Sequence, residues 1–319
     1  MRPKIVTLGT GTGQRRIIEG LPRDACERTA VVGVTDNGGS SAVLRRSLSM
    51  PQPGDTRNCL TAMSPDSTLR KLFDFRFQSG DLAGVNLGNY ILGALTEIEG
   101  DFGLAVERAG ELLAPDGRVL PVSTTSTQVA AELVDGNRIY GEWEIIRREP
   151  RVRILRVFLE EALPIYPPAS AAIREADLIV IGPGSLRTGI LPVLLTTGLK
   201  DAVRASGAPV VYICNLMTQP GQTDGYSARA HVEEVERYLG MSVDHVVLNR
   251  TPIPNELREH FRALGSEPVE DDFGEDVRVR RADLLQGDSI ETLRKHRRPD
   301  NVFFLYHDAA ALGQVILAL

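Results

Sequence analysis

The sequence predicts an α/β fold: a three-layer, doubly wound (Rossmann-like), mainly parallel sheet with a helical block and a small β-rich insertion. Short β-branched runs alternate with helical patterns at the start of the chain, and again from the run LIVIG, which ends at Gly182. LIVIG and VVYIC carry no polar alternation, as is typical of strands buried on both faces of a parallel sheet. No repeat or long linker is visible, so we expect one α/β domain over residues 1–319.

Elements at both ends of the chain are expected to build the sheet. The later strands are LIVIG, VVYIC and HVVL, which end at Gly182, Cys214 and Leu248, and each is followed by loop residues and a helix. The first elements follow a βαβα order, with strands expected over residues 4–8 and 29–35 and short helices over 15–21 and 42–48.

A helical block is expected over residues 55–114. Residues 51–55 predict a turn, and the carboxylate of Asp55 is expected to cap a helix over 56–63, because it can accept hydrogen bonds from the free amides of the first turn. The other helices of the block are expected near residues 68–77, 87–98 and 104–113.

A β-rich insertion is expected over residues 117–160. This segment contains RVLPVST, QVAAELV, NRIYGEWEII and RVRILRVFLE, separated by turn residues such as Asp135-Gly136-Asn137. Trp143, the single tryptophan, is expected to pack within the insertion. We expect the insertion to fold onto the main sheet.

Composition limits the functions that need consideration. The chain has 319 residues, of which 42% are hydrophobic and 24% charged, so it can build a proper core. A net charge of −6 argues against a general nucleic-acid binder, and no apolar run approaches the roughly 20 residues of a membrane span. The three cysteines show no CxxC spacing and the N-terminus does not resemble a signal peptide, so a cytoplasmic protein is expected.

The predicted strand ends carry the strongest functional pattern. Ligands of open parallel sheets bind beyond the carboxyl ends of the strands, near the point where strand order reverses. Glycines there let backbone amides approach an anion, hydroxyls add donors, and the helix behind each loop directs its positive end at that anion. We therefore expect a phosphate-bearing ligand, with Asp36 placed to bind a ribose or a metal, at four loops: residues 9–13, 36–41, 182–185 and 215–221.

Other catalytic patterns are absent from the sequence. Gln14 stands where GxGxxG needs glycine, and no GK[ST], HExxH or paired CxxC is present. Ser185 lacks the GxSxG context of a nucleophile elbow. His307-Asp308 begins the last helix and is interpreted as a cap in preference to a catalytic pair, and the basic run over 294–298 as a solvated helix end. Each glycine loop taken alone is also consistent with a tight turn.

Seven phrases together resemble one superfamily, that of 2-phospho-L-lactate transferase (CofD) and the bacterial gluconeogenesis factor (YvcK). The resemblance covers residues 4 to about 231, and the last two phrases are more similar to the gluconeogenesis-factor branch. The phrases are TGTG at Thr10, TDNGGSS at Thr35, PGDTRNCL at Pro53, LGN at Leu87, VLPVS at Val119, GPGSLRTGILP at Gly182 and NLMTQPGQTDGY at Asn215.

The resemblance implies a nucleotide-type ligand at the strand ends. In the transferase branch, a phospholactyl group passes from a guanosine diphosphate conjugate to a deazaflavin with help from a divalent metal. In the other branch, a cytoplasmic regulator of carbon metabolism, cell shape and envelope synthesis binds nucleotide sugars of the uridine diphosphate type. The implied ligand-binding residues are Gly11, Thr12, Gly13, Asp36, Asn37, Gly38, Gly39, Ser40, Asn89, Gly184, Ser185 and Asn215.

The chain departs from the family pattern at several positions. Asn37 follows Asp36 where the family usually has two adjacent acids, which weakens a site for a hard divalent cation. Val85-Asn86 replaces a usual histidine and serine, and Gly189 a usual serine. Arg187 replaces a usual tyrosine, and two interpretations remain open for it: pairing with a diphosphate, or simple solvation.

Two functions from different classes follow. The preferred hypothesis is a nucleotide-sugar binding regulator without turnover and with no certain cofactor. The alternative is a transferase of a phosphate-linked group from a nucleoside diphosphate donor, in which Asp36 and Asp55 hold Mg²⁺ or act as base. Asp55 as a plain helix cap is an equal interpretation. The sequence leaves open the base, the sugar, the protein partners and a homodimer through apolar surface of the helical block or the insertion.

Overall fold

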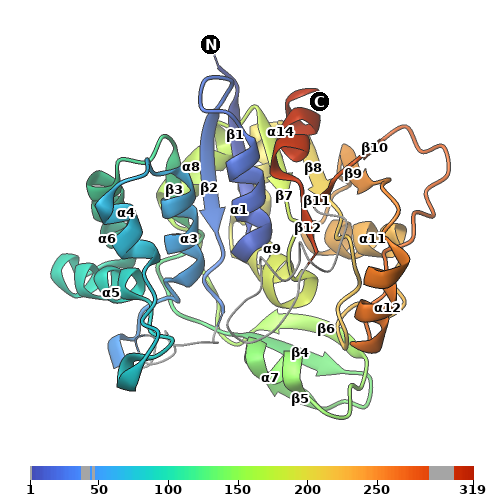
Figure 1. Ribbon diagram of the computed structural model, residues 1–319, viewed down its shortest axis with the longest axis horizontal. Coiled ribbons are helices and arrows are strands. Elements are labelled where there is room, and N and C mark those ends of the chain that lie inside the picture. Colours follow the sequence, from blue (N-terminus) through green and yellow to red (C-terminus); the bar gives the residue numbers. More distant parts are fainter. Residues whose placement is uncertain (1, 37–43, 45–46, 287–304) are drawn as a thin grey trace.

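A computed structural model describes residues 2–36, 44, 47–286 and 305–319. A central sheet of seven strands runs through it in the order β10-β9-β8-β7-β1-β2-β3 (Figure 1). All neighbouring pairs are parallel, which confirms the predicted doubly wound sheet. The strands are β1 (Lys4–Gly9), β2 (Glu27–Val32), β3 (Arg118–Pro121), β7 (Leu178–Ile181), β8 (Val210–Ile213), β9 (His245–Asn249) and β10 (Val279–Ala282).

Alternate residues of the strands point to opposite faces of the sheet and pack into two separate cores. Ile5 and Val180 pack with α1 (Gly11–Gly20) and α14 (Ala309–Leu317), which lie in front of the sheet in Figure 1. Val6 and Ile181 point to the opposite face. That face packs against α8 (Pro167–Arg174), α10 (Leu199–Ser206) and α11 (Ala228–Leu239). Burial on both faces explains why the strands are apolar throughout.

The helical block lies beside β3, at one edge of the sheet. One prediction within it is wrong: α3 begins at Gly54 after Pro53, so Asp55 is the second residue of the helix and not its cap. Ser67, Asn86 and Asp101 cap the next three α-helices by accepting a backbone amide. The block comprises α3 (Gly54–Met63), α4 (Thr68–Asp74), the short η1 (Gly80–Leu82), α5 (Leu87–Glu99) and α6 (Phe102–Leu113).

The antiparallel insertion covers a shorter stretch of the chain than predicted. Its sheet has the order β5-β4-β6, whereas the RVLPVST run forms β3 of the central sheet. The NRIYGEWEII run is not one strand, because Gly141 adopts φ +100° after β5 and a helix follows. Figure 1 places this small sheet beyond the carboxyl ends of the central strands. Its elements are β4 (Val129–Leu133), β5 (Arg138–Tyr140), α7 (Glu142–Arg147) and β6 (Ile154–Leu159).

The last helix begins where the sequence predicted. Asp308 caps it, since its side chain accepts the amide of Ala311 at 2.8 Å. Most of the helix expected over residues 42–48, and the basic run over 294–298, fall outside the described residues. In the described part of the chain, no helix is long and apolar enough to cross a membrane. The other elements are η2 (Leu186–Ile190), α9 (Leu191–Leu194), α12 (Asn255–Ala263), β11 (Leu285–Gln286) and β12 (Tyr306–His307).

Candidate functional site

Two of the predicted loops pack backbone to backbone where strand order reverses, between β1 and β7. A Cβ added to Gly13, in the first turn of α1, would lie 2.0 Å from the carbonyl oxygen of Pro183, so only glycine allows this approach. Thr12 lies next to it in the same turn. Gly11 adopts φ +61°, and a Cβ there would lie 3.8 Å from a carboxylate oxygen of Asp55. The structure thus brings Gly11, Thr12, Gly13 and Asp55 together.

Side-chain amides join the loops that follow β7 and β8. The Asn215 side chain donates to the carbonyl of Gly184 at 2.8 Å and accepts from its amide at 3.4 Å. Ser185 Oγ bonds to Gln222 Oε1 at 3.2 Å, and the amide of Leu186 donates to Gln219 Oε1 at 3.1 Å. Asn215 therefore holds the loop of Gly184 in place. Gly184 and Ser185 themselves are only half-buried, which leaves them accessible to a ligand.

An acidic side chain that we did not predict reaches this edge from the insertion. Glu142, the first residue of α7, accepts a hydrogen bond from Thr188 Oγ1 at 3.1 Å, and Thr188 lies 2.6 Å from Ser185 Oγ. Glu142 is also hydrogen-bonded to Asp36 and lies within electrostatic range of Asp55. No local motif marks Glu142 in the sequence, because only the fold of the insertion carries it to the strand ends.

The environment of Glu142 favours its protonated form. Burial is the main cause that raises its pKa well above 4.5, and the negative charge of Asp36, the hydrogen bond to Asp36 and the charge of Asp55 raise the pKa further. Two adjacent carboxyl groups cannot both ionise without a large electrostatic cost. Glu142 can therefore keep its proton beside Asp36, an arrangement suited to proton transfer or to hydrogen bonding with hydroxyl groups.

A metal would have to compete with this proton. Hard cations such as Mg²⁺ favour carboxylate oxygens, which Asp36, Asp55 and Glu142 supply. Across residues 2–36, 44, 47–286 and 305–319, however, no group of three or more His, Cys, Asp or Glu side chains is arranged to hold a metal ion. The predicted ligand-binding residues Asn37, Gly38, Gly39 and Ser40 lie outside the described residues.

Of the two roles that the sequence left open for Arg187, the structure excludes simple solvation. Its side chain is 3% exposed and lies in a buried network. Nε donates to the carbonyl of Gln222 at 2.9 Å, and Nη2 donates to the hydroxyl of Tyr226 at 2.6 Å. Nη1 lies 3.3 Å from Glu234 Oε1, close enough for an ion pair but not aligned for a hydrogen bond. Arg187 therefore fixes the loop after β8 against η2.

Asn89 is buried at the start of α5, where its backbone amide bonds to the side chain of Asn86 at 3.0 Å. Its Oδ1 accepts a hydrogen bond from Arg57 Nε at 3.0 Å. Arg57 also donates to Asp74 Oδ1 at 2.8 Å, and burial lowers its pKa to about 10. The family phrases at Pro53 and Leu87 thus meet through a hydrogen bond between side chains, which sequence alone does not show.

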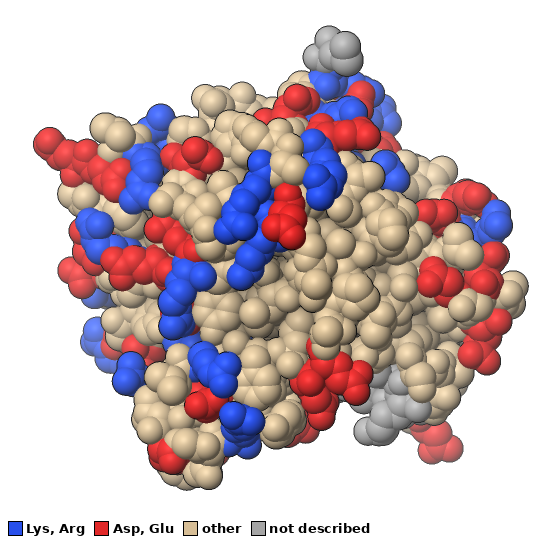
Figure 2. Space-filling model, turned by 180° about the vertical axis from the view of Figure 1, so that it is seen from behind, with Lys and Arg blue, Asp and Glu red and all other residues tan. Residues whose placement is uncertain are grey.

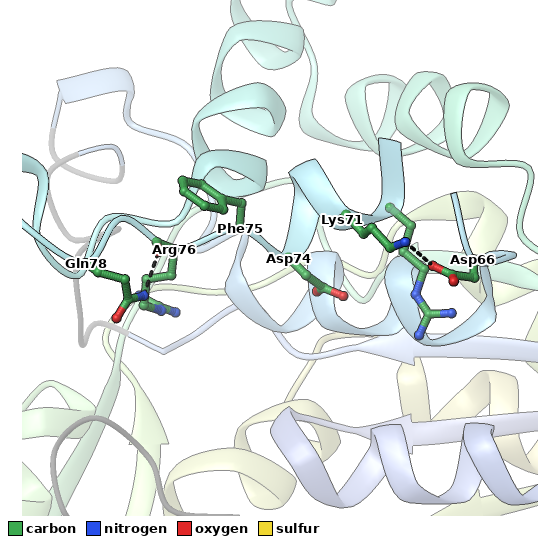
Figure 3. Close-up of a pocket in the computed structure, with 7 residues that line it drawn as sticks. Asp66, Lys71, Asp74, Phe75, Arg76 and Gln78 are labelled. Carbon is green, nitrogen blue, oxygen red and sulfur yellow. Dashed lines mark hydrogen bonds and ion pairs between the residues drawn. The ribbon is translucent and has the colours of Figure 1, made fainter. Parts of the chain in front are cut away.

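A surface cavity lies elsewhere, on the helical block. It has a volume of about 590 Å³ and is open, and Figure 3 shows Lys71 and Asp66 paired across it. A second cavity, of about 310 Å³, lies where Lys4 and Glu27 begin β1 and β2, at the amino ends of the strands. Neither is lined by a predicted ligand-binding residue. The first is lined by Asp66, Arg70, Lys71, Asp74, Phe75, Arg76 and Gln78.

Surface charge is mixed on the face opposite to that of Figure 1. Figure 2 shows acidic side chains beside the basic ones over much of that face, around a broad uncharged area. A nucleic-acid binding face needs a dominant basic surface to displace counterions from phosphates. The face in Figure 2 shows no dominant basic surface, and the net charge of −6 also disfavours binding to nucleic acid.

Comparison with known proteins relates the chain to a single family. Residues 5–289 match the family described as 2-phospho-L-lactate transferase CofD. The gluconeogenesis factor of Bacillus subtilis is 43% identical over 278 residues, which cover 86% of this chain and 87% of the relative. The gluconeogenesis factor of Listeria monocytogenes is 39% identical over 307 residues, which cover 91% of this chain and 95% of the relative.

A solved structure agrees with this relationship. The crystal structure of a Bacillus halodurans protein, described as a member of the UPF0052 family, superimposes with a TM-score of 0.89 at 36% sequence identity. The match covers 99% of this chain and 100% of the other. From its matching fold, its family match and its relatives named gluconeogenesis factor, we conclude that the chain belongs to the CofD family, as the seven phrases predicted.

Proposed function

We propose that this chain is a cytosolic protein that binds a nucleotide sugar of the uridine diphosphate type at the carboxyl edge of its sheet. In this proposal it regulates carbon metabolism, cell shape and envelope synthesis through its ligand-bound state, without turnover. The observation that carries the proposal is the set of ties among the strand-end loops. Gly13 packs on Pro183, and Asn215 holds Gly184, so the backbone amides of two loops are held close together at one edge. Loops fixed in advance reduce the entropic cost of binding.

The charges divide the site into two parts. The glycine loops at Gly11 and Gly184 offer backbone donors, which suit a diphosphate. Glu142 lies beside Asp36 and within electrostatic range of Asp55, and carboxyl groups repel phosphate but form strong hydrogen bonds with neutral hydroxyl groups. A nucleotide sugar satisfies both parts, because it carries a diphosphate between two groups rich in hydroxyls.

The transferase remains a second candidate, favoured by one observation. Glu142 has a raised pKa and lies beside Asp36, and a carboxyl group whose pKa is raised by burial and a neighbouring charge is a common general acid. In this candidate function, Mg²⁺ bound with a nucleoside diphosphate would stabilise the leaving diphosphate. Asp36 and Asp55 would then be the residues that hold the cation.

Replacing Gly184 with alanine tests the proposed binding site. A Cβ at Gly184 would lie 3.6 Å from its nearest protein neighbour, an ordinary contact, so the free protein should tolerate the Gly184→Ala change. A phosphate lying against the amide of Gly184 would not tolerate it. We expect binding of UDP-glucose, measured by isothermal titration calorimetry without Mg²⁺, to weaken about tenfold or more, while thermal stability stays nearly unchanged.

Gly110→Ala is the matched control, because nothing lies within 4 Å of a Cβ at that position in α6. It should leave binding unchanged. If the unmodified protein binds no uridine, guanosine or nicotinamide nucleotide with or without Mg²⁺, the proposal is wrong. If it consumes a nucleoside diphosphate conjugate in the presence of Mg²⁺, and Asp36→Ala abolishes product formation, the transferase function replaces it.

A further inference from the structure

The antiparallel insertion is bonded to the strand-end loops by polar side chains that are buried or half-buried. Glu142 of α7 is hydrogen-bonded to Thr188 of η2. On β6, the backbone amide and carbonyl of Val157 both bond to the hydroxyl of Tyr238 from α11, at 2.8 and 3.1 Å. The third tie is made by Arg148, at the end of α7. Together these bonds connect the insertion to the loops after β7 and β8 and to the helix that follows.

Arg148 is the residue that binds the insertion to the loop after β8. Its side chain is buried, with 8% exposed, and donates only to backbone carbonyls. Within the insertion it bonds to Ile145 at 2.5 Å and to Val152 at 2.9 Å. Its Nη2 also donates to the carbonyl of Gly221, across to the loop. A planar guanidinium can satisfy these acceptors at once, whereas the ammonium of a lysine cannot reproduce the geometry.

The carbonyl that Arg148 holds lies beside the residues that shape the ligand loops. Gln222, directly after Gly221, bonds to Ser185 Oγ at 3.2 Å. Gln219, two residues before Gly221, accepts the amide of Leu186 at 3.1 Å. A displacement of Gly221 would therefore shift both glutamines, and with them the loop of Gly184 and Ser185.

The neighbouring Arg147 provides a contrast within the same helix. It is exposed, and its guanidinium lies 3.7 Å from the ring centroid of Trp143, which is itself 42% exposed. Arg147 is in the last turn of α7, so it shares the helix and the charge of Arg148. Among the described contacts, Arg147 has none with the loops after β7 or β8.

We propose that the insertion is a clamp on the strand-end site, and that Arg148 is the positioning residue through which it acts. The identity of the ligand in this proposal rests on the proposed function, whereas the contacts made by the insertion do not depend on it. Since binding free energies are reciprocal, a ligand that needs the loops in this arrangement must also stabilise the insertion that holds them. Ligand binding at the site is thereby coupled to the stability of the antiparallel sheet of the insertion. A protein partner that contacts this sheet would distinguish the ligand-bound form from the free form.

The test compares the unmodified protein with Arg148→Ala, Arg148→Lys and the matched control Arg147→Ala. Amide hydrogen exchange is followed by mass spectrometry with and without UDP-glucose. In the unmodified protein, the ligand should slow exchange across residues 129–159 as well as in the loops. Arg148→Ala should weaken UDP-glucose binding about tenfold and remove the protection of 129–159, while Arg147→Ala changes neither.

Arg148→Lys separates positioning from general packing. It retains the charge and much of the aliphatic stem, so the insertion stays folded, but the fork geometry is lost. We expect its UDP-glucose affinity to lie between those of Arg148→Ala and the unmodified protein. Unchanged exchange over 129–159 when the unmodified protein binds UDP-glucose would overturn the proposal, and so would full affinity in Arg148→Ala.

The clamp can be judged even if the proposed function fails. Should no nucleotide bind the unmodified protein, exchange of residues 215–223 without ligand decides the question. Faster exchange there in Arg148→Ala than in the unmodified protein and in Arg147→Ala supports the clamp. Equal exchange in all three proteins refutes it.

Discussion

The strand-end site and the cavity of the helical block both contain arginines and acids, yet they differ in how those groups are held. At the strand ends the polar groups are buried or half-buried: Arg187 is 3% exposed and is bonded twice to the loop after β8. In the cavity, Lys71 and Asp66 are 71% and 75% exposed and form one contact of 3.4 Å. This pair of the cavity is therefore exposed to solvent, in contrast to Arg187.

This difference teaches that a measurable cavity does not by itself identify a site. Burying a charge is costly unless it is paired and hydrogen-bonded, so a buried polar network persists only where the surrounding fold fixes it. Exposed ion pairs cost little and constrain little. The rigid arrangement lies at the strand ends, where the family phrases also meet, and three measurements can break or sharpen this contrast.

The largest effect is expected for Arg187→Ala. The change removes two buried hydrogen bonds of Arg187 and leaves the buried carboxylate of Glu234 with one exposed partner. We expect a loss of about 3–5 kcal/mol in the free energy of unfolding, measured by urea denaturation. Arg237→Ala is the control, because Arg237 also pairs with Glu234, at 2.5 Å, but its side chain is 54% exposed. It should cost no more than about 1 kcal/mol. Similar losses in the two variants would remove the distinction between buried and exposed pairs.

A smaller, pH-dependent effect is expected for Glu142→Gln. The pKa of Glu142 is raised above 4.5 in the folded protein, so the folded state keeps this proton to higher pH than the unfolded chain does. The stabilisation is complete below pH 4.5 and is lost as pH rises through the raised pKa. Glutamine cannot ionise, so the Glu142→Gln variant should not lose stability for this reason as the pH rises.

The measurement is urea denaturation of the two proteins at a series of pH values above 4.5. Through the window between the two pKa values, the unmodified protein should lose stability relative to Glu142→Gln by about 1.4 kcal/mol per pH unit. The opposite slope would mean that Glu142 is ionised in the folded state. Glu144→Gln, in the exposed part of the same helix, serves as the control.

The smallest effect is expected in the cavity of the helical block. Lys71→Ala removes the exposed pair with Asp66, and the free energy of unfolding should change by less than about 0.5 kcal/mol. Binding of UDP-glucose should stay the same. A loss of binding in this variant would move the ligand site to the cavity shown in Figure 3 and reverse the comparison.

Patterns with a local cause could be read from the sequence. The apolar strands, the cap at Asp308 and the turn at Asp135 follow from burial or from hydrogen bonds between near neighbours, and all three are present. The start of α3 and the helix after Gly141 were missed, because helix boundaries depend on one or two backbone angles. The buried network of Arg187 was not predicted, because its partners Gln222 and Glu234 are distant in sequence.

The sequence by itself determined the sheet, its direction and the edge at which the glycine loops gather, because periodicity and turn chemistry act over a few residues. Only the tertiary structure decided which side chains meet there. Glu142 reaches Asp36, and Arg148 reaches Gly221, from an insertion whose own sequence shows no functional motif. These contacts depend on how a separate small sheet docks on the main one, and docking is set by the packing of whole surfaces, which no local pattern specifies.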